Sequence, residues 1–141
     1  MSQQNIDQFI SSINSINHEN AKEVLHRIYT NDVKFVDPVK TINGLDELTD
    51  YFEALYKRVN RCHFVLSNYI PNTDNHSLEW VMHLQHEKIS KNQEIHVDGA
   101  SFLQFDGEKV CYHRDYYDLG ALVYEHVPIL GSVVKKVRHA I

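Results

Sequence analysis

The segment Lys109–Leu122 holds the residues with the clearest capacity for chemistry. Val110–Asp118 is rich in aromatic and β-branched residues, which is typical of a strand. Strand side chains alternate between two faces, so one face should carry a thiol, an imidazole, a carboxylate and a phenol in a row: Cys111, His113, Asp115 and Tyr117. Groups of these types can exchange protons with a bound molecule, which makes this face the first candidate site.

Asp115 is the first candidate for a general acid or base, because a carboxylate in apolar surroundings suits proton transfer. The alternative is that Asp115 pairs with an arginine or accepts backbone amides at the end of the sheet. Asp37 is the second candidate, although an aspartate directly before a proline often only forms a turn. His113 either orients a substrate or is a packed core histidine, and Tyr117 is expected in the wall of the pocket.

The ten histidines do not form a recognisable metal motif. His83 and His86 are three residues apart on a predicted strand and should face opposite sides. His63, His96 and His113 could converge, but their spacing does not show it. We therefore expect no metal and no cofactor. Two cysteines, Cys62 and Cys111, have no metal or redox spacing, which favours a reducing cytoplasm.

The elements that must position these residues fall into two groups, with helices before strands. Apolar residues at helical spacing predict helices from Ile6 to Ile16, from Ala21 (capped by Asn20) to Ile28, and after Gly44, where Phe52 and Tyr56 face inward. A short strand, Val33–Val36, precedes Asp37. Alternating patterns then predict four strands, over Cys62–Ile70, Leu78–Ile89, Glu94–Phe105 and Lys109–Asp118.

This order predicts an α+β fold in which the helices cover one face of a curved, consecutively antiparallel sheet. The concave end of such a sheet is where small molecules tend to bind. We expect Trp80, Phe52, Tyr56 and Ser101 to contact the substrate there. The position of Ser101 depends on the hairpin at Asp106-Gly107: a two-residue loop places it on the Tyr112 side, and one extra turn residue places it beside His113.

Length, charge and hydropathy narrow the functional classes. At 141 residues the chain is predicted to form one domain, residues 1–141. A formal net charge of −5 argues against nucleic-acid binding, which needs a basic surface. No apolar run is long enough for a membrane span, and the polar N-terminus does not have the pattern of a signal peptide. We therefore expect a cytoplasmic location.

The C-terminal extension, residues 123–141, is predicted to contain an amphipathic helix. Six apolar residues share one of its faces: Ile129, Leu130, Val133, Val134, Val137 and Ile141. Three basic residues and no acidic ones occupy 129–141. The apolar face could dock on the body of the protein or on a partner subunit, close the pocket, or make weak contact with a membrane surface.

The chain resembles the nuclear-transport-factor-2-like (NTF2-like) superfamily. The resemblance covers Ile6–Leu122 and rests on helices followed by FVDP at Phe35–Pro38, then Gly44 and a further helix. GASFLQFDGEKV at Gly99–Val110 and HRDYYD at His113–Asp118 are similar to its SnoaL-like branch, whose relatives include ketosteroid isomerases and limonene epoxide hydrolases. This resemblance implies a cone-shaped fold and a homodimer packed through the outer face of the sheet.

The resemblance assigns roles to only some residues. Asp37 matches the position of the isomerases' general base, and Asp115 that of an acid–base aspartate in the hydrolases. The isomerases' oxyanion-hole acid would fall near Ser101, and their tyrosine near Ser11 or Ser12, so both donors are missing. The hydrolases' Arg-x-Asp pair is absent around Met82–Gln85. Neither known site is intact.

Two functions are therefore predicted as alternatives. The first is an enzyme that isomerises, cyclises or hydrolyses an apolar small molecule, with Asp37 and Asp115 carrying protons and His113 and Tyr117 orienting the substrate. The second is a non-catalytic module that binds a ligand or a protein. An enzyme should place both carboxylates around one cavity, whereas a binding module need not.

Overall fold

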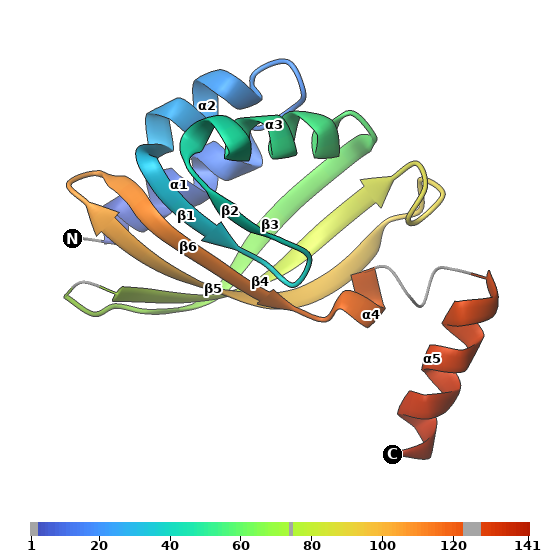
Figure 1. The fold of residues 1–141 in the computed structure, drawn as a ribbon. Helices are drawn as coiled ribbons and strands as arrows, with labels where there is room; N and C mark the ends of the chain where they lie inside the picture. Colours follow the sequence, from blue (N-terminus) through green and yellow to red (C-terminus); the bar gives the residue numbers. More distant parts are fainter. Residues whose placement is uncertain (1–2, 74, 123–127) are drawn as a thin grey trace.

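The computed structural model describes residues 3–73, 75–122 and 128–141 (Figure 1). The helices are α1 (Gln3–Asn14), α2 (Ala21–Ile28), α3 (Leu45–Tyr56), α4 (Leu119–Leu122) and α5 (Pro128–Ala140). The strands are β1 (Tyr29–Val36), β2 (Thr41–Asn43), β3 (Val59–Ile70), β4 (Asn75–His86), β5 (Ile95–Asp106) and β6 (Lys109–Tyr117). The predicted α+β class is confirmed. None of the described helices has both the length and the apolar character that a membrane span requires.

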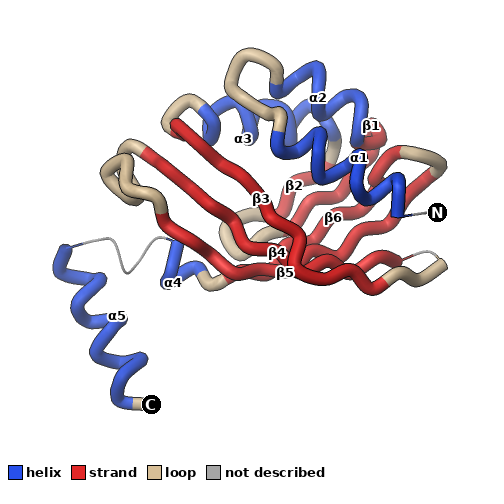
Figure 2. The backbone as a smooth tube through the Cα atoms, turned by 180° about the vertical axis from the view of Figure 1, so that it is seen from behind, coloured by secondary structure: helices blue, strands red, loops and turns tan. Residues whose placement is uncertain are grey.

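The strands form one curved, open sheet in the order β2-β1-β6-β5-β4-β3. β3 to β6 are consecutive antiparallel neighbours, as predicted. The sequence did not predict that β1 pairs with β6 in parallel, nor that β2 pairs with β1. α1, α2 and α3 lie together on one side of the sheet, which curves around them as an open cone (Figures 1 and 2).

The first two helices pack as their apolar spacing predicts. α1 buries Ile6, Phe9 and Ile13, and α2 buries Ala21, Val24, Leu25 and Ile28. Asn20 stands at the N-cap of α2, but its side chain does not cap the helix. Its Oδ1 instead accepts a hydrogen bond of 2.7 Å from the Asn17 amide, so the side chain stabilises the preceding turn.

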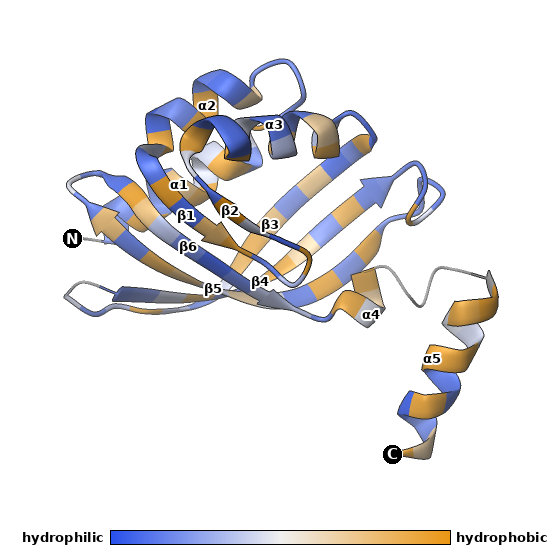
Figure 3. Ribbon diagram, in the orientation of Figure 1, coloured by the Kyte–Doolittle hydropathy of each residue, from blue (hydrophilic) through white to orange (hydrophobic). Residues whose placement is uncertain are grey.

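Successive side chains of the four long strands point alternately toward the helices and toward the outer face. Hydrophobic and hydrophilic residues accordingly alternate along each strand (Figure 3). On β4 every second residue from His76 to His86 is buried. The predicted strand, Leu78–Ile89, was displaced by three residues, because residues 87–90 form the turn after β4 and not its end.

A bulge in β6 decides which of its side chains face inward. Asp106 pairs with Lys109 across a two-residue turn, but the register shifts so that Gln104 pairs with Tyr112 and Phe105 with Val110, leaving Cys111 unmatched. Val110 is fully buried in the core, and the predicted placement of Cys111 beside His113 is wrong. Beyond the bulge, Ser101 pairs with Asp115. Ser101 therefore lies on the His113 side, through a bulge and not through a longer turn.

The C-terminal segment forms a helix, as predicted, but its apolar face does not pack on the sheet. Ile129 is 83% exposed and Val137 is 56% exposed. α5 is joined to the start of α4 by an ion pair between Arg138 and Asp118, and this hydrogen-bonded arginine holds the pKa of Asp118 below its usual value. A partner subunit and a membrane surface remain predicted contacts of α5. Residues 123–127 of the predicted extension lie outside the described residues.

Trp80 and Gly99 form a cross-strand pair that shapes the inner face of the sheet. The indole ring lies over Gly99, where any Cβ atom would overlap its carbons. This close approach lets the indole N–H donate to Ser101 Oγ at 2.8 Å. The glycine therefore positions Trp80 toward the polar residues of β5 and β6.

We expect Gly99→Ala to lower the free energy of unfolding by about 1–3 kcal/mol, because the added methyl group must displace the Trp80 ring. Urea denaturation measures the change. Asp98→Ala, on the exposed face beside Gly99, is the matched control. If the clash is the cause, Gly99→Ala should cost less in a Trp80→Phe background; an equal cost in both backgrounds would contradict this explanation.

Candidate active site

A cavity of about 320 Å³ lies between α3 and the inner face of the sheet. Its wall is mainly apolar and includes Phe35, Phe52, Tyr56, Trp80, Met82 and Leu84. The polar side chains that reach the same cavity include those of Asp37, Tyr51, His113, Asp115 and Tyr117. The two predicted carboxylates therefore lie around one cavity. An apolar cavity with a few convergent polar groups is the usual form of a small-molecule site.

A chain of hydrogen bonds runs through the wall of this cavity from β1 to β4. The Tyr29 hydroxyl lies 2.7 Å from His113 Nδ1, and His113 Nε2 lies 2.6 Å from Asp115 Oδ1. From the other side, the Ser101 hydroxyl donates to the same Asp115 oxygen at 2.5 Å and accepts a hydrogen bond from the Trp80 indole N–H. His113 and Ser101 thus bond the Asp115 carboxylate directly, and each of them is bonded in turn by a residue from another strand.

The Asp115 carboxylate, which can only accept, sets the direction of these hydrogen bonds. Tyr29 is fully buried, and both its burial and the nearby Asp115 charge raise its pKa, so its hydroxyl stays protonated. Because the Asp115 carboxylate accepts, the imidazole nitrogen that donates to it is Nε2. In the tautomer with its proton on Nε2, Nδ1 accepts the Tyr29 hydroxyl. In this arrangement both ring nitrogens of His113 and the hydroxyls of Tyr29 and Ser101 have a partner, as buried groups require.

Asp37 is held by the turn that follows it. Its Oδ1 accepts the backbone amides of Val39 and Lys40, each at 2.8 Å, and its Oδ2 accepts the Tyr51 hydroxyl at 3.0 Å. This is the turn-forming role that the sequence analysis gave as the alternative. Asp37 reaches the cavity, but its carboxylate is already occupied by three donors.

Two phenols at the cavity retain their protons. Burial, followed by the nearby Asp37 charge, raises the pKa of both Tyr51 and Tyr117. Each can therefore serve as a hydrogen-bond donor at neutral pH. Burial also raises the pKa of the Cys62 thiol in the cavity wall to about 11, which keeps this cysteine protonated and unreactive.

The structure thus brings together most residues predicted for the site. Asp37, Asp115, His113 and Tyr117 line the cavity, as do Trp80, Phe52 and Tyr56. Ser101 is not part of the lining; it is buried behind Asp115 and contacts the carboxylate. Cys111 is displaced by the bulge. His113 lies in the cavity wall and His96 on the outer face of the sheet, so these histidines do not converge.

Sequence reasoning missed Tyr29 and Tyr51. Tyr29 was not assigned because the strand was predicted to begin at Val33, whereas β1 begins at Tyr29. Tyr51 follows Leu48 by three residues and precedes Leu55 by four, a helical spacing that could have placed it on the inward face.

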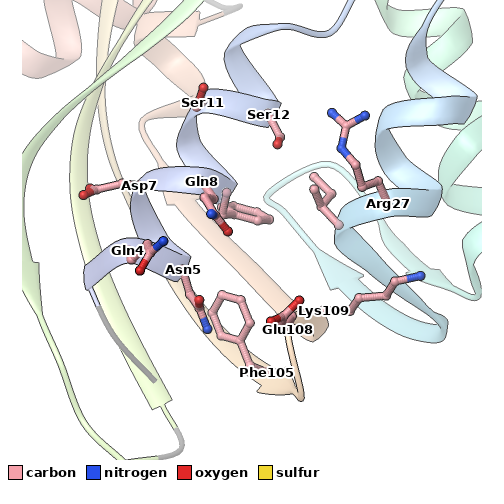
Figure 4. Close-up of a pocket in the computed structure, with 12 residues that line it drawn as sticks. Gln4, Asn5, Asp7, Gln8, Ser11, Ser12, Arg27, Phe105, Glu108 and Lys109 are labelled. Atoms are coloured by element: carbon pink, nitrogen blue, oxygen red, sulfur yellow. The ribbon is translucent and has the colours of Figure 1, made fainter.

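A second depression, of about 630 Å³, lies on the surface between α1, α2 and the β5–β6 turn (Figure 4). Its charged residues have mixed signs: Asp7, Arg27, Glu108 and Lys109. Ser11 and Ser12 line this depression and not the apolar cavity. These are the positions at which the sequence resemblance would place the isomerases' tyrosine, so α1 supplies no hydroxyl to the site there.

We expect Asp37→Ala to lower the free energy of unfolding by about 1–3 kcal/mol, because two turn amides and the Tyr51 hydroxyl lose their acceptor. Asp37→Asn is the matched control, since its amide oxygen can still accept both backbone bonds, and it should cost less. Urea denaturation measures both. Equal losses for the two variants would show that the turn bonds do not account for the effect.

Tyr29→Phe should destabilise the protein by about 1–3 kcal/mol, because it leaves the buried His113 Nδ1 without a donor. Tyr116→Phe removes the same hydroxyl from a half-exposed tyrosine on the outer face and should change stability by less than about 0.5 kcal/mol. Thermal and urea unfolding of both variants make the comparison. A Tyr29→Phe variant as stable as the unmodified protein would refute a stabilising hydrogen bond between Tyr29 and His113.

Comparison with solved structures identifies the fold. A protein from Catenulispora acidiphila, with a ketosteroid isomerase-like fold and in complex with trimethylamine, superposes with a TM-score of 0.73 at 15% identity, covering 86% of this chain and 91% of that one. A proposed SnoaL-like polyketide cyclase from Shewanella denitrificans gives 0.70 at 18% identity, covering 82% and 89%. A proposed SnoaL-like isomerase from Agrobacterium tumefaciens gives 0.63 at 14%, covering 82% and 95%.

No curated protein sequence matches the chain. The family model of the SnoaL-like domain matches residues 8–113, about three quarters of the sequence, which include β1, α3 and His113. Together with the open cone of strands, this match establishes that the chain belongs to the SnoaL-like domain family of the NTF2-like superfamily.

Proposed function

We propose that this protein is an enzyme that transfers protons to and from an apolar small molecule, in an isomerisation, cyclisation or hydrolysis. The observation that carries this proposal is the hydrogen-bonded chain that ends on Asp115 at the wall of the cavity. Side chains spaced for packing alone would not need an imidazole and a carboxylate there. The chemistry requires no cofactor.

Asp115 acts as the general base and acid. Both of its hydrogen bonds fall on Oδ1, so Oδ2 is the oxygen left to take a proton from a molecule in the cavity. Its side chain is only 15% exposed, which keeps competing water away. His113 and Ser101 hold the carboxylate in place and stabilise its charged form, and Tyr29 in turn fixes the orientation of the imidazole.

Tyr117 and Tyr51 are the hydrogen-bond donors that would stabilise negative charge on the substrate. When Asp115 removes a proton from the carbon beside a carbonyl, negative charge develops on the carbonyl oxygen. A protonated phenol aimed at that oxygen stabilises it, as the missing oxyanion-hole donors do in related enzymes. Tyr117 is the first choice, because the Tyr51 hydroxyl already donates to Asp37.

The structural neighbours are consistent with this reaction class. Some are proposed polyketide cyclases and one is a proposed isomerase. Both kinds of reaction can begin with removal of a proton from carbon. The small size of the cavity favours a compact ligand.

A non-catalytic ligand-binding module is the second candidate function. The observation that favours it is the full occupation of Asp37 by turn amides and Tyr51, which removes one of the two predicted acid–base groups. The cavity would then only enclose its ligand.

The homodimer and the cytoplasmic location remain predictions. Three exposed apolar side chains on the outer face of the sheet support the dimer: Val65, Phe102 and Tyr116.

Deuterium exchange separates the two functions. A panel of small cyclic ketones and 1,3-diketones is incubated with the protein in D₂O, and loss of the α-proton signal is followed by NMR. We expect exchange faster than in buffer for at least one probe. Asp115→Asn should slow the protein-dependent exchange by about 100-fold or more. Asp98→Asn, an exposed carboxylate on the outer face, should leave it unchanged.

Binding of the same probes is measured in parallel by the change in their NMR line widths. Probes that bind without faster exchange would establish the binding module and refute the enzyme. Exchange that survives Asp115→Asn unchanged would refute the role of Asp115.

A further inference from the structure

Two histidines and a glutamate meet on the outer face of the sheet, on the side opposite the cavity. His83 of β4 and His96 of β5 are direct cross-strand partners, and their ring centroids lie 4.1 Å apart. Glu94 directly precedes β5 and stands two residues before His96, so both side chains point to the same face. Sequence reasoning paired His83 with His86 and missed this group.

The potential ligand atoms of the three side chains lie close together. Glu94 Oε2 lies 3.1 Å from His96 Nε2 and 3.7 Å from His83 Nδ1, and all three ligand atoms lie within 4.8 Å of one another. Two ligands of a tetrahedral zinc ion are about 3.3–3.5 Å apart, given bonds of about 2.0–2.2 Å. The observed separations bracket this value, so small side-chain rotations would accommodate an ion.

The backbone beneath the site is well supported. The turn between β4 and β5 is closed by buried His86, whose Nδ1 accepts the amides of Lys88 and Ile89. Burial lowers the pKa of His86, which keeps the ring neutral and able to accept. The Ser90 hydroxyl donates to the His86 carbonyl. Glu94 is therefore presented from an ordered turn, which limits the entropy lost when an ion binds.

We propose that His83, Glu94 and His96 form a binding site for a divalent transition metal ion of the zinc class. Two imidazoles and one carboxylate are a common three-residue ligand set for zinc, with a fourth position open to water. Arg61 lies near Glu94, and its positive charge opposes binding of a cation. His63, the cross-strand partner of His83, lies next to the site on β3.

The ion would join β4 to β5 near their turn and would not take part in chemistry in the cavity. The site and the cavity lie on opposite faces of the sheet, because His83 alternates with the cavity residues Met82 and Leu84. The proposal is therefore independent of the proposed acid–base function. Its expected effect is stabilisation of the folded state in proportion to metal binding.

Isothermal titration of tag-free protein with zinc chloride tests the site. We expect saturable binding of one ion per chain. Removing a residue that merely supports a metal ligand costs about 10- to 100-fold in affinity, so His83→Ala, His96→Ala and Glu94→Gln should each weaken binding at least tenfold. All three side chains are at least partly exposed, so the variants should fold, which circular dichroism verifies.

His18→Ala is the matched control. His18 and Glu19 form a similar histidine–glutamate pair, 3.8 Å apart, on the surface. This variant should bind zinc as the unmodified protein does. Zinc should also raise the melting temperature of the unmodified protein and not that of Glu94→Gln. Absence of saturable binding, binding that survives the three site variants, or an equal loss in His18→Ala would overturn the proposal.

Discussion

The positions of the site residues depend on one extra residue in β6, Cys111, which forms a bulge in the strand. With the same two-residue turn and no bulge, Val110 would still pair with Phe105, but His113 would pair with Phe102 and turn to the outer face together with Asp115. The bulge at Cys111 keeps Val110 in the core and brings His113, Asp115 and Tyr117 to the inner face. It also sets Ser101 opposite Asp115. The hydrogen-bonded chain from Tyr29 to Trp80 follows from this register.

The chain also shows how a buried carboxylate can be kept in an apolar wall. Asp115 accepts two hydrogen bonds on one oxygen, and each donor is itself held by another buried group. Leaving a charge there without donors would be strongly unfavourable. The support comes from β1, β4 and β5, so the site is built into the sheet and not into its connecting segments.

The sequence was sufficient to predict the fold and most of the cavity. Alternating patterns located the four long strands to within about three residues, and helical spacing located α1, α2 and α3, because those elements are half-buried and carry strong periodic signals. Pairings between distant segments could not be predicted. The parallel contact of β1 with β6 leaves no local pattern, and without it Tyr29 could not be assigned to the site. The bulge at Cys111 likewise depends on packing across two strands. His83, Glu94 and His96 escaped notice because their contact depends on the hairpin register of β4 and β5.

From the parallel pairing of β1 with β6 we also infer an order of folding. Tyr29 and His113 are separated by 84 residues, whereas β3 to β6 are joined by short turns, so neighbouring strands can pair through local contacts. Closing so long a loop costs conformational entropy before its contacts compensate, and folds dominated by such contacts form slowly. The meander should therefore form before β1 docks. The hydrogen bonds of Asp115 with His113 and Ser101 lie within the meander, so we expect the bond between Tyr29 and His113 to be the last of this network to form.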